Sequence, residues 1–246
     1  MIAALSDVSV AYARGSALGP FSMSLAAGEI VALVGPSGCG KSTALRLLAG
    51  LEQPTTGTVT RAAGRGETAV VFQAATLMPW ASALTNVALP LELAGMPRAP
   101  ARTKAAEALA LVKLSGFEDC KPAQLSGGMA MRAAIARALV SSPRLLLLDE
   151  PFAALDEITR RALADDVHQL WGLEKPAIVF VTHNVEEAVY MASRVLVLSP
   201  GPGRLVGEVA ISGALPRSPG FRTDPTFRDA AETVSALLAT AMEPAA

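Results

Sequence analysis

The sequence predicts an α/β fold with a mostly parallel core sheet, an antiparallel β edge and an inserted helical lobe. Short charge-free aliphatic runs alternate with stretches whose apolar residues recur at helical spacing. Such runs, separated by helices, are typical of parallel strands that are covered on both faces. Residues 2–30 and 55–72 instead combine β-forming residues with glycine turns and few helix signals, which favours antiparallel strands.

The elements of the core can be placed in order along the chain. Strands are expected at residues 30–34, 69–72, 145–148, 178–181 and 195–198. Helices are expected at residues 41–49, 101–114, 127–140, 157–171 and 185–192. A last helix is marked by Asp224 as its N-cap residue and by Pro225 at its first position.

We expect a single domain over residues 1–246, a length that can bury a substantial core. Residues 74–140 contain helical patterns without a strand pattern, so they are expected to form the helical lobe. The core is then made of residues 1–73 and 141–211, and residues 212–246 form a C-terminal extension.

Charge and cysteine content exclude several functions. The 21 Lys and Arg residues balance 22 Asp and Glu residues to a formal net charge of −1. This balance gives no basic field to hold a nucleic-acid backbone, so DNA or RNA binding is not expected. Cys39 and Cys120 cannot make a disulfide framework and fit a reducing compartment.

No segment has the composition of a membrane-spanning helix. The longest charge-free stretch, residues 68–91, is interrupted by Gln73, Asn86 and two prolines. The first basic residue is Arg14, so the start lacks the charged head of a secretory signal. We expect a soluble chain, and its 51% of hydrophobic residues favours a surface that a partner covers.

A phosphate-binding loop is the clearest motif. Gly35-Pro36-Ser37-Gly38-Cys39-Gly40-Lys41-Ser42 matches G-x-x-x-x-G-K-[ST] between an expected strand and an expected helix, and Thr43 follows it. Glycines let backbone N–H groups converge on a phosphate at a helix N-terminus. Lys41 can reach the β and γ oxygens, and the Ser42 hydroxyl can bind Mg²⁺. The alternative is a glycine-rich turn with an unrelated lysine, and Cys39 is expected to be a small spacer rather than a redox switch.

Two carboxylates follow the aliphatic strand at residues 145–148. Asp149 stands at the carboxyl end of that strand, where it can hold Mg²⁺ directly or through water. Glu150 is one residue further on, where it can polarise a water molecule for attack on the γ-phosphorus. The alternative is an ordinary acidic turn at Asp149-Glu150-Pro151.

Between these sites lies Leu125-Ser126-Gly127-Gly128-Met129, followed by a helical pattern. With this motif the chain resembles the nucleotide-binding subunit of an ABC transporter, over nearly its whole length. The matching positions, in the family's order, are Tyr12, the loop 35–42, Gln73, residues 125–129, Asp149-Glu150, Asp156 and His183. The resemblance implies a P-loop NTPase fold and the hydrolysis of ATP with Mg²⁺.

Ser126 is a good N-cap, and the two glycines after it expose the first amides of a helix that can bind an anion. One nucleotide does not need two such cradles from one chain. In the family, Ser126, Gly127 and Gly128 would close on ATP held by a second subunit in a head-to-tail dimer. A homodimer is expected, although a pair of related cassettes stays open, and an ordinary capped helix is the alternative for the motif itself.

Other roles rest on the resemblance. Tyr12 would stack on adenine, unless it only packs within its strand. Gln73 would contact Mg²⁺ or the attacking water, His183 the γ-phosphate, and Asp156 the nucleotide site. Leu77, Met78 and Trp80 would face an integral membrane permease, unless they form a local hydrophobic cluster. His168 has no partner pattern and is expected to be a solvated bystander.

Several positions depart from the common family pattern and point to a branch. Met129 replaces the usual glutamine, and together with Pro79-Trp80 and residues 199–204 it is similar to importers of nitrate, sulfonate and taurine. Met131 replaces a hydrogen-bonding residue, but it shares an i, i+4, i+8 stripe with Ile135 and Leu139, which favours core packing.

The resemblance implies an ATPase subunit of an importer of small organic or inorganic anions. It would work at the cytoplasmic face of the inner membrane with a permease and, indirectly, a solute-binding protein. Two alternatives are a soluble ABC ATPase acting on DNA, ribosomes or cofactor assembly, and a module that senses ATP without hydrolysing it. The first usually carries two cassettes, coiled-coil insertions or basic surfaces, and Glu150 and His183 argue against the second.

Overall fold

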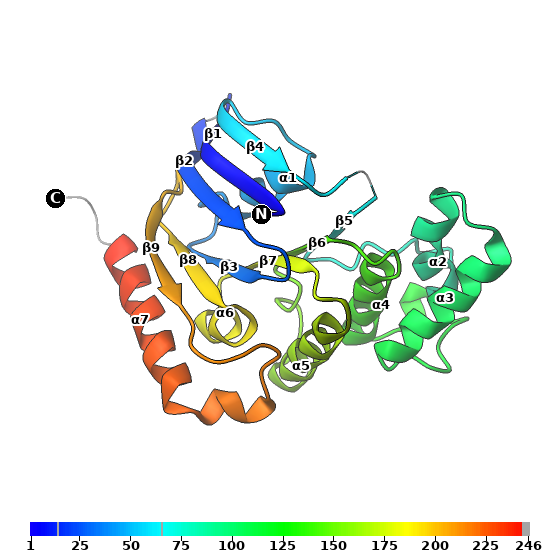
Figure 1. Cartoon of the computed structure of the whole chain (residues 1–246). Helices are drawn as coiled ribbons and strands as arrows, with labels where there is room; N and C mark the ends of the chain where they lie inside the picture. The colour runs from blue at the N-terminus through cyan, green and yellow to red at the C-terminus, as the bar shows by residue number, and fades with distance from the viewer. Residues whose placement is uncertain (14, 65, 243–246) are drawn as a thin grey trace.

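Two β-sheets organise the fold in the computed structural model, which describes residues 1–13, 15–64 and 66–242 (Figure 1). Arg14, Arg65 and residues 243–246 lie outside the described residues. The core sheet has the order β5 (Thr68–Val71), β6 (Leu145–Asp149), β7 (Ala177–Thr182), β3 (Ile30–Val34), β8 (Arg194–Leu198) and β9 (Leu205–Ala210). The first five strands are parallel, and β9 is antiparallel to β8. The predicted fold class is therefore confirmed.

The antiparallel strands form a sheet of their own. Its order is β2 (Gly15–Leu25), β1 (Ala3–Tyr12) and β4 (Thr56–Arg61). The antiparallel edge of the core sheet is instead β9, a strand that the sequence did not predict. Its residues are exposed or half-buried throughout, so the strand lacks the buried aliphatic run that marks its neighbours.

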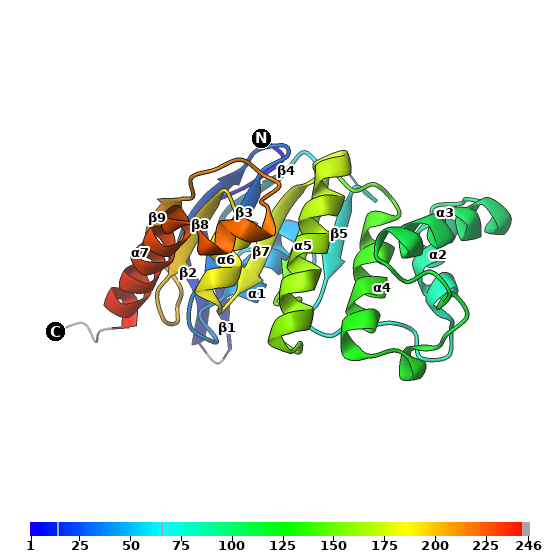
Figure 2. The same cartoon turned by 90° about the horizontal axis from the view of Figure 1, so that it is seen from below.

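The alternation of side chains along the core strands divides the apolar core in two. On one face, Leu33 packs in a cluster with Leu48 of α1 (Lys41–Ala49) and Phe21 of the antiparallel sheet. On the other face, Phe180 lies in a cluster with Phe152, with ring centroids 5.4 Å apart. Helices α5 (Glu157–Glu174), α6 (Val185–Met191) and α7 (Pro225–Met242) belong to this second face (Figure 2).

Three helices lie to one side of the core sheet, beyond β5 (Figures 1 and 2). They are α2 (Ala83–Leu93), α3 (Arg98–Leu111) and α4 (Gly127–Leu139). Helix α3 starts three residues before the expected position and ends before Lys113, whose φ of 60° is left-handed. Of the stripe expected on α4, Met131 and Ile135 are buried in the core, whereas Leu139 is half-buried against it.

The C-terminal helix also follows its sequence signals. Asp224 accepts a 2.8 Å hydrogen bond from the backbone N–H of Thr226, and Phe227 and Val234 are the buried residues of α7. Among the described helices, none is both long and apolar enough to cross a membrane.

The prediction for His168 was wrong. Its side chain is 1% exposed, and Nε2 lies 3.0 Å from the carbonyl oxygen of Tyr190. The two rings pack edge to face, with centroids 5.1 Å apart. The partner is on α6, 22 residues further along the chain, so the local pattern around His168 gave no sign of it.

Candidate nucleotide-binding site

The phosphate loop connects the end of β3 to the start of α1. Gly38 and Gly40 adopt left-handed φ values of 78° and 103°, and a Cβ on Gly40 would lie 2.5 Å from the carbonyl oxygen of Ala17. Gly40 is also the N-cap of α1, whose first turn contains no acidic residue. The loop and the helix N-terminus therefore present backbone N–H groups and a positive dipole end, as anion binding requires.

A cavity of about 360 Å³ opens in front of this loop. Its lining is Ala17, Ser37, Gly38, Gly40, Lys41, Ser42, Thr43, Arg46, Gln73 and Glu150. The chain thus brings most of the predicted phosphate loop together with Gln73 and Glu150, although these lie far apart in sequence. Arg46 was not predicted, but it follows Ser42 by four residues on α1 and so shares its face of the helix.

Lys41 is held in place by the loop itself. Its side chain is buried, and Nζ donates to the carbonyl oxygens of Gly35 at 2.7 Å and Pro36 at 2.9 Å. Cys39 is fully buried beside it, and burial raises the pKa of the Cys39 thiol. A buried, protonated thiol is a poor nucleophile, which supports the prediction that Cys39 is a spacer. Cys39 and Cys120 are both free.

The acidic end of β6 faces the start of α1. The Ser42 hydroxyl donates a 2.9 Å hydrogen bond to Oδ1 of Asp149, and burial raises the pKa of the Asp149 carboxyl. A hydroxyl and a desolvated carboxylate in contact are suitable oxygen ligands for Mg²⁺. The donor set therefore fits the ion.

Glu150 and His183 meet at the ends of β6 and β7. Nδ1 of His183 lies 3.0 Å from Oε2 of Glu150, a hydrogen bond in which the carboxylate accepts. The backbone of Glu150 has a left-handed φ of 45°, and its N–H donates to the carbonyl oxygen of Val181 at 2.9 Å. This backbone turns the Glu150 side chain into the cavity, where it can reach a water molecule beside a bound phosphate.

Asp149 and His183 do not line this cavity themselves, but they contact its lining residues Ser42 and Glu150. Ser126, Asp156 and Tyr12 also lie outside the lining. Ser126 caps α4 and accepts a 3.2 Å hydrogen bond from Met129 N–H, while Asp156 caps α5 and accepts one of 3.0 Å from Thr159 N–H. That bond lowers the pKa of the Asp156 carboxyl. Tyr12 is 47% exposed at the end of β1, and its hydroxyl donates to Glu52. The chain does not bring these groups to its own phosphate loop.

The chain is similar to known proteins over most of its length. The family model described as ABC transporter matches residues 18–153. The chain belongs to the ABC transporter family. It is 43% identical to the taurine import ATP-binding protein TauB of Burkholderia pseudomallei, a match that covers 91% of each chain. It is 46% identical to an uncharacterized ABC transporter ATP-binding protein of Methanocaldococcus jannaschii, over 83% of this chain and 78% of the relative.

Solved ABC cassettes share the fold. One is a dimeric post-hydrolysis state of an ATP-binding cassette bound to ADP and Pi, with a TM-score of 0.78 and 32% identity. It covers 87% of this chain and 100% of that chain. Family and structural neighbour together identify this ABC cassette as an ATPase.

Hydrogen bonds with Asn86 and Arg137 hold the segment that follows Gln73. Asn86 is fully buried; it accepts from Met78 N–H at 2.7 Å and donates to three carbonyl groups, one of them that of Met78. Arg137 of α4 donates to the carbonyl oxygen of Thr76 at 2.8 Å. Trp80 is 74% exposed, whereas Leu77 and Met78 are half-buried. Of the three residues expected at an apolar surface, only Trp80 presents most of its side chain.

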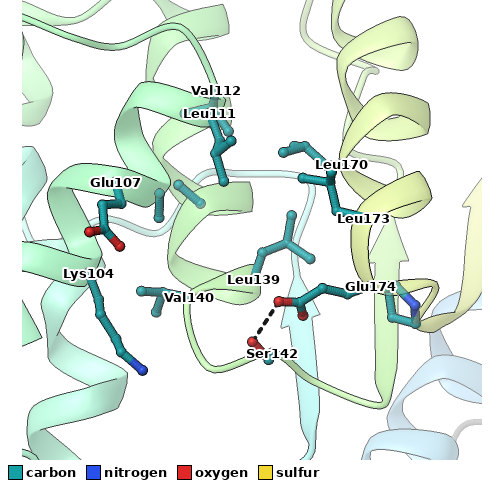
Figure 3. Close-up of a pocket in the computed structure, with 13 residues that line it drawn as sticks. Lys104, Glu107, Leu111, Val112, Leu139, Val140, Ser142, Leu170, Leu173 and Glu174 are labelled. Carbon is teal, nitrogen blue, oxygen red and sulfur yellow. Dashed lines mark hydrogen bonds between the residues drawn. The ribbon is translucent and has the colours of Figure 1, made fainter.

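A second cavity lies between α3, α4 and α5 (Figure 3). Its volume is about 240 Å³, and its apolar wall includes Leu139 and Leu170. At its edge the Ser142 hydroxyl donates to Glu174 at 2.9 Å. No residue of the phosphate loop lines it, so it is separate from the nucleotide cavity.

Proposed function

We propose that this chain is the ATP-hydrolysing subunit of an importer for small anions of the nitrate, sulfonate or taurine type. Two copies would bind MgATP at a head-to-tail interface, and closing and reopening of that interface would move a membrane permease. The likeness to the taurine import protein TauB supports the importer and its class of solute. The observation that carries the proposal is the cavity that joins the phosphate loop to Gln73 and Glu150.

Binding of the triphosphate is assigned to the phosphate loop. Backbone N–H groups of Gly35 and residues 37–43 would surround the β-phosphate, and Lys41 would donate to the β and γ oxygens in place of the carbonyl groups it now contacts. Ser42, Asp149 and Gln73 would hold Mg²⁺. When bound, this ion neutralises charge on the β and γ oxygens.

Hydrolysis is assigned to Glu150 and His183. The Glu150 carboxylate accepts a proton from a water molecule while the water oxygen attacks the γ-phosphorus, which breaks the bond to ADP and yields phosphate. The hydrogen bond from Nδ1 of His183 orients Glu150 and leaves the other ring nitrogen for the γ-phosphate. Both groups act by position and charge, as phosphoryl transfer requires.

The remaining site residues are assigned to the second subunit's nucleotide. The chain's own cavity is not lined by Ser126, Gly127, Gly128 or Asp156. We therefore assign these residues to the ATP bound by a neighbouring copy in a symmetric dimer. Gly127 has open space around it, which leaves the start of α4 accessible to a phosphate. Tyr12 is assigned instead to the adenine ring of the chain's own nucleotide, since its side chain is half exposed at the end of β1.

The partners and the location follow from this assignment. The exposed Trp80 after Gln73 is proposed as a contact for the permease at the cytoplasmic face of the inner membrane, and a solute-binding protein would act through that permease. The division into a core, a lobe over residues 74–140 and an extension over 212–246 remains part of the proposal. A net charge of −1 gives no reason to add a nucleic-acid partner.

Co-purification tests the proposal. A tagged copy of the chain, expressed with the proteins encoded beside its gene, should recover a hydrophobic permease in detergent. Trp80→Ser should reduce that recovery severalfold, whereas Leu205→Ser, which changes an exposed residue of β9, should not. Recovery with ribosomes or DNA and without a membrane protein would contradict the importer. Growth of an operon deletion on single nitrogen and sulfur sources would then identify the solute.

A further inference from the structure

A nearly buried ion pair connects helices α5 and α6, which lie side by side on one face of the core sheet (Figure 2). Nε of Arg160 lies 3.3 Å from Oε1 of Glu187. The Glu187 side chain is 10% exposed and that of Arg160 is 24% exposed. The contact is an ion pair rather than a hydrogen bond, because Nε of Arg160 has no hydrogen-bond partner among the described residues. Removing Arg160 would leave the Glu187 carboxylate poorly solvated and without this charge beside it.

Glu187 also holds the segment that carries His183. The Thr182 hydroxyl, at the end of β7, donates a 2.6 Å hydrogen bond to Oε2 of Glu187 and accepts one of 3.0 Å from Asn184 N–H. Asn184 in turn accepts from Glu187 N–H at 3.1 Å. Both neighbours of His183 are therefore tied to one carboxylate or its backbone.

Arg160 holds the turn that precedes the start of α5. One of its terminal nitrogens donates a 3.0 Å hydrogen bond to the carbonyl oxygen of Leu155, the residue before Asp156. The guanidinium thus contacts Glu187 on one side and the turn that presents Asp156 on the other. Its third contact is weaker, at 3.5 Å to the half-exposed Glu157.

These contacts form one continuous path. It runs from Glu150 through His183 and Thr182 to Glu187, and then through Arg160 to the turn before Asp156. Its first members belong to the proposed hydrolytic site, and its end belongs to the helix start that we assign to a second subunit's nucleotide. A shift of either loop must break or stretch the Glu187–Arg160 contact.

We propose that Glu187 and Arg160 are positioning residues that fix the His183 loop relative to the Asp156 turn, so that hydrolysis in one site depends on the placement of both. This inference rests on the proposed roles of His183 and Asp156. Neither Glu187 nor Arg160 lines the nucleotide cavity. The pair therefore affects the rate of the chemical step and leaves ATP binding nearly unchanged.

Steady-state hydrolysis and equilibrium ATP binding by the purified chain test the inference. Glu187→Gln and Arg160→Gln should each lower kcat about tenfold, since small misplacements of catalytic groups cost that much or more. KM and the Kd for ATP should stay within about twofold. The double variant should be no slower than the slower single variant, because both changes break the same contact.

Matched controls lie next to each residue. Arg161→Gln removes an exposed ion pair to Glu157 on the same helix, and Glu186→Gln changes the neighbouring acid on α6. Both should hydrolyse ATP within about twofold of the parent. If Arg160→Gln fails to fold, Arg160→Lys keeps the charge but loses the two-sided contact, and should still lower kcat selectively.

The outcomes separate this inference from the proposed function. Parental kcat in Glu187→Gln and Arg160→Gln, or a parallel loss of kcat and ATP affinity, would overturn the positioning role. Glu150→Gln serves as the reference in the same assay. If it is inactive while the pair variants match their controls, only the positioning role fails; if it hydrolyses ATP normally, the assignment of the catalytic site fails first.

Discussion

The Ser42 hydroxyl donates a 2.9 Å hydrogen bond to the carboxylate of Asp149, 107 residues further along the chain. This contact joins the first turn of α1 to the last residue of β6. It places two oxygen atoms that we assign to Mg²⁺ at the edge of the nucleotide cavity, one from the phosphate loop and one from the core sheet. Burial raises the pKa of the Asp149 carboxyl, and the hydrogen bond from Ser42 partly offsets this effect by stabilising the carboxylate.

Asp149→Asn should separate stability from magnesium binding. Burial raises the pKa of the Asp149 carboxyl, so its charged form is unfavourable in the folded chain. Asparagine removes the charge and keeps an acceptor for Ser42, so the free energy of unfolding should be at least as high as in the parent. The apparent affinity for Mg²⁺ in ATP hydrolysis should fall about tenfold to a hundredfold. Urea unfolding and a Mg²⁺ titration measure the two effects, and an unchanged Mg²⁺ affinity would remove Asp149 from the metal site.

Lys41→Ala should weaken nucleotide binding itself. The side chain is buried in the phosphate loop, and a charged hydrogen bond to phosphate contributes about 1.5–3 kcal/mol. The Kd for ATP, measured by calorimetry, should therefore rise about tenfold or more. Lys104→Ala, which changes an exposed lysine of α3, is the matched control and should bind like the parent. An unchanged ATP affinity in Lys41→Ala would contradict the placement of the phosphate site.

Glu150→Gln should bind MgATP and lose at least about a hundredfold in turnover, because glutamine keeps an acceptor for His183 but cannot take a proton from water. Because ATP then persists, a dimer should accumulate in size-exclusion chromatography with light scattering. Glu174→Gln, at the separate cavity of Figure 3, is the control: like the parent, it should hydrolyse ATP and should not accumulate as a dimer. Turnover at the parental rate in Glu150→Gln would exclude Glu150 as the general base.

Most of the fold and much of the site could be predicted because the deciding signals are local. The strand at Ile30–Val34 and the helix at Lys41–Ala49 have the predicted bounds, since a fully buried run and a glycine-rich helix start mark them. The phosphate loop is one continuous motif whose conformation depends on its own glycines. Its approach to Gln73 and Glu150 follows from a general rule, that parallel strands present their carboxyl ends at one edge of the sheet.

The remaining features depend on contacts between distant segments. Strand β9 pairs with β8 through its backbone and exposes side chains that carry no strand pattern. The antiparallel strands could have extended the core sheet, but α1 packs between the two sheets instead. Arg160 meets Glu187 across two helices, and neither residue belongs to a motif that marks the pairing. His168 was misjudged for the same reason, because its partner Tyr190 lies on a different helix, α6.

The buried His168 should make stability depend on pH. Burial lowers its pKa from 6.5 to about 4 in the folded chain, and among the described residues its Nδ1 atom has no hydrogen-bond partner. Nearby are the guanidinium groups of Arg217 and Arg222, which also disfavour a protonated ring, and Asp165, which favours one less strongly than burial opposes it. Below pH 6.5 the unfolded chain takes up a proton that the folded chain refuses, so stability is lost as the pH falls from 6.5 toward 4.

Urea unfolding at pH 7 and pH 5 measures this contribution. The shift between 6.5 and about 4 predicts that His168 lowers the free energy of unfolding by about 2 kcal/mol between these two pH values. His168→Phe keeps an aromatic ring against Tyr190 but cannot titrate, so its stability should fall by correspondingly less over the same interval. An identical loss of stability in the parent and in His168→Phe would show that the buried ring is not the group that titrates, and would place the acid sensitivity in the carboxylates instead.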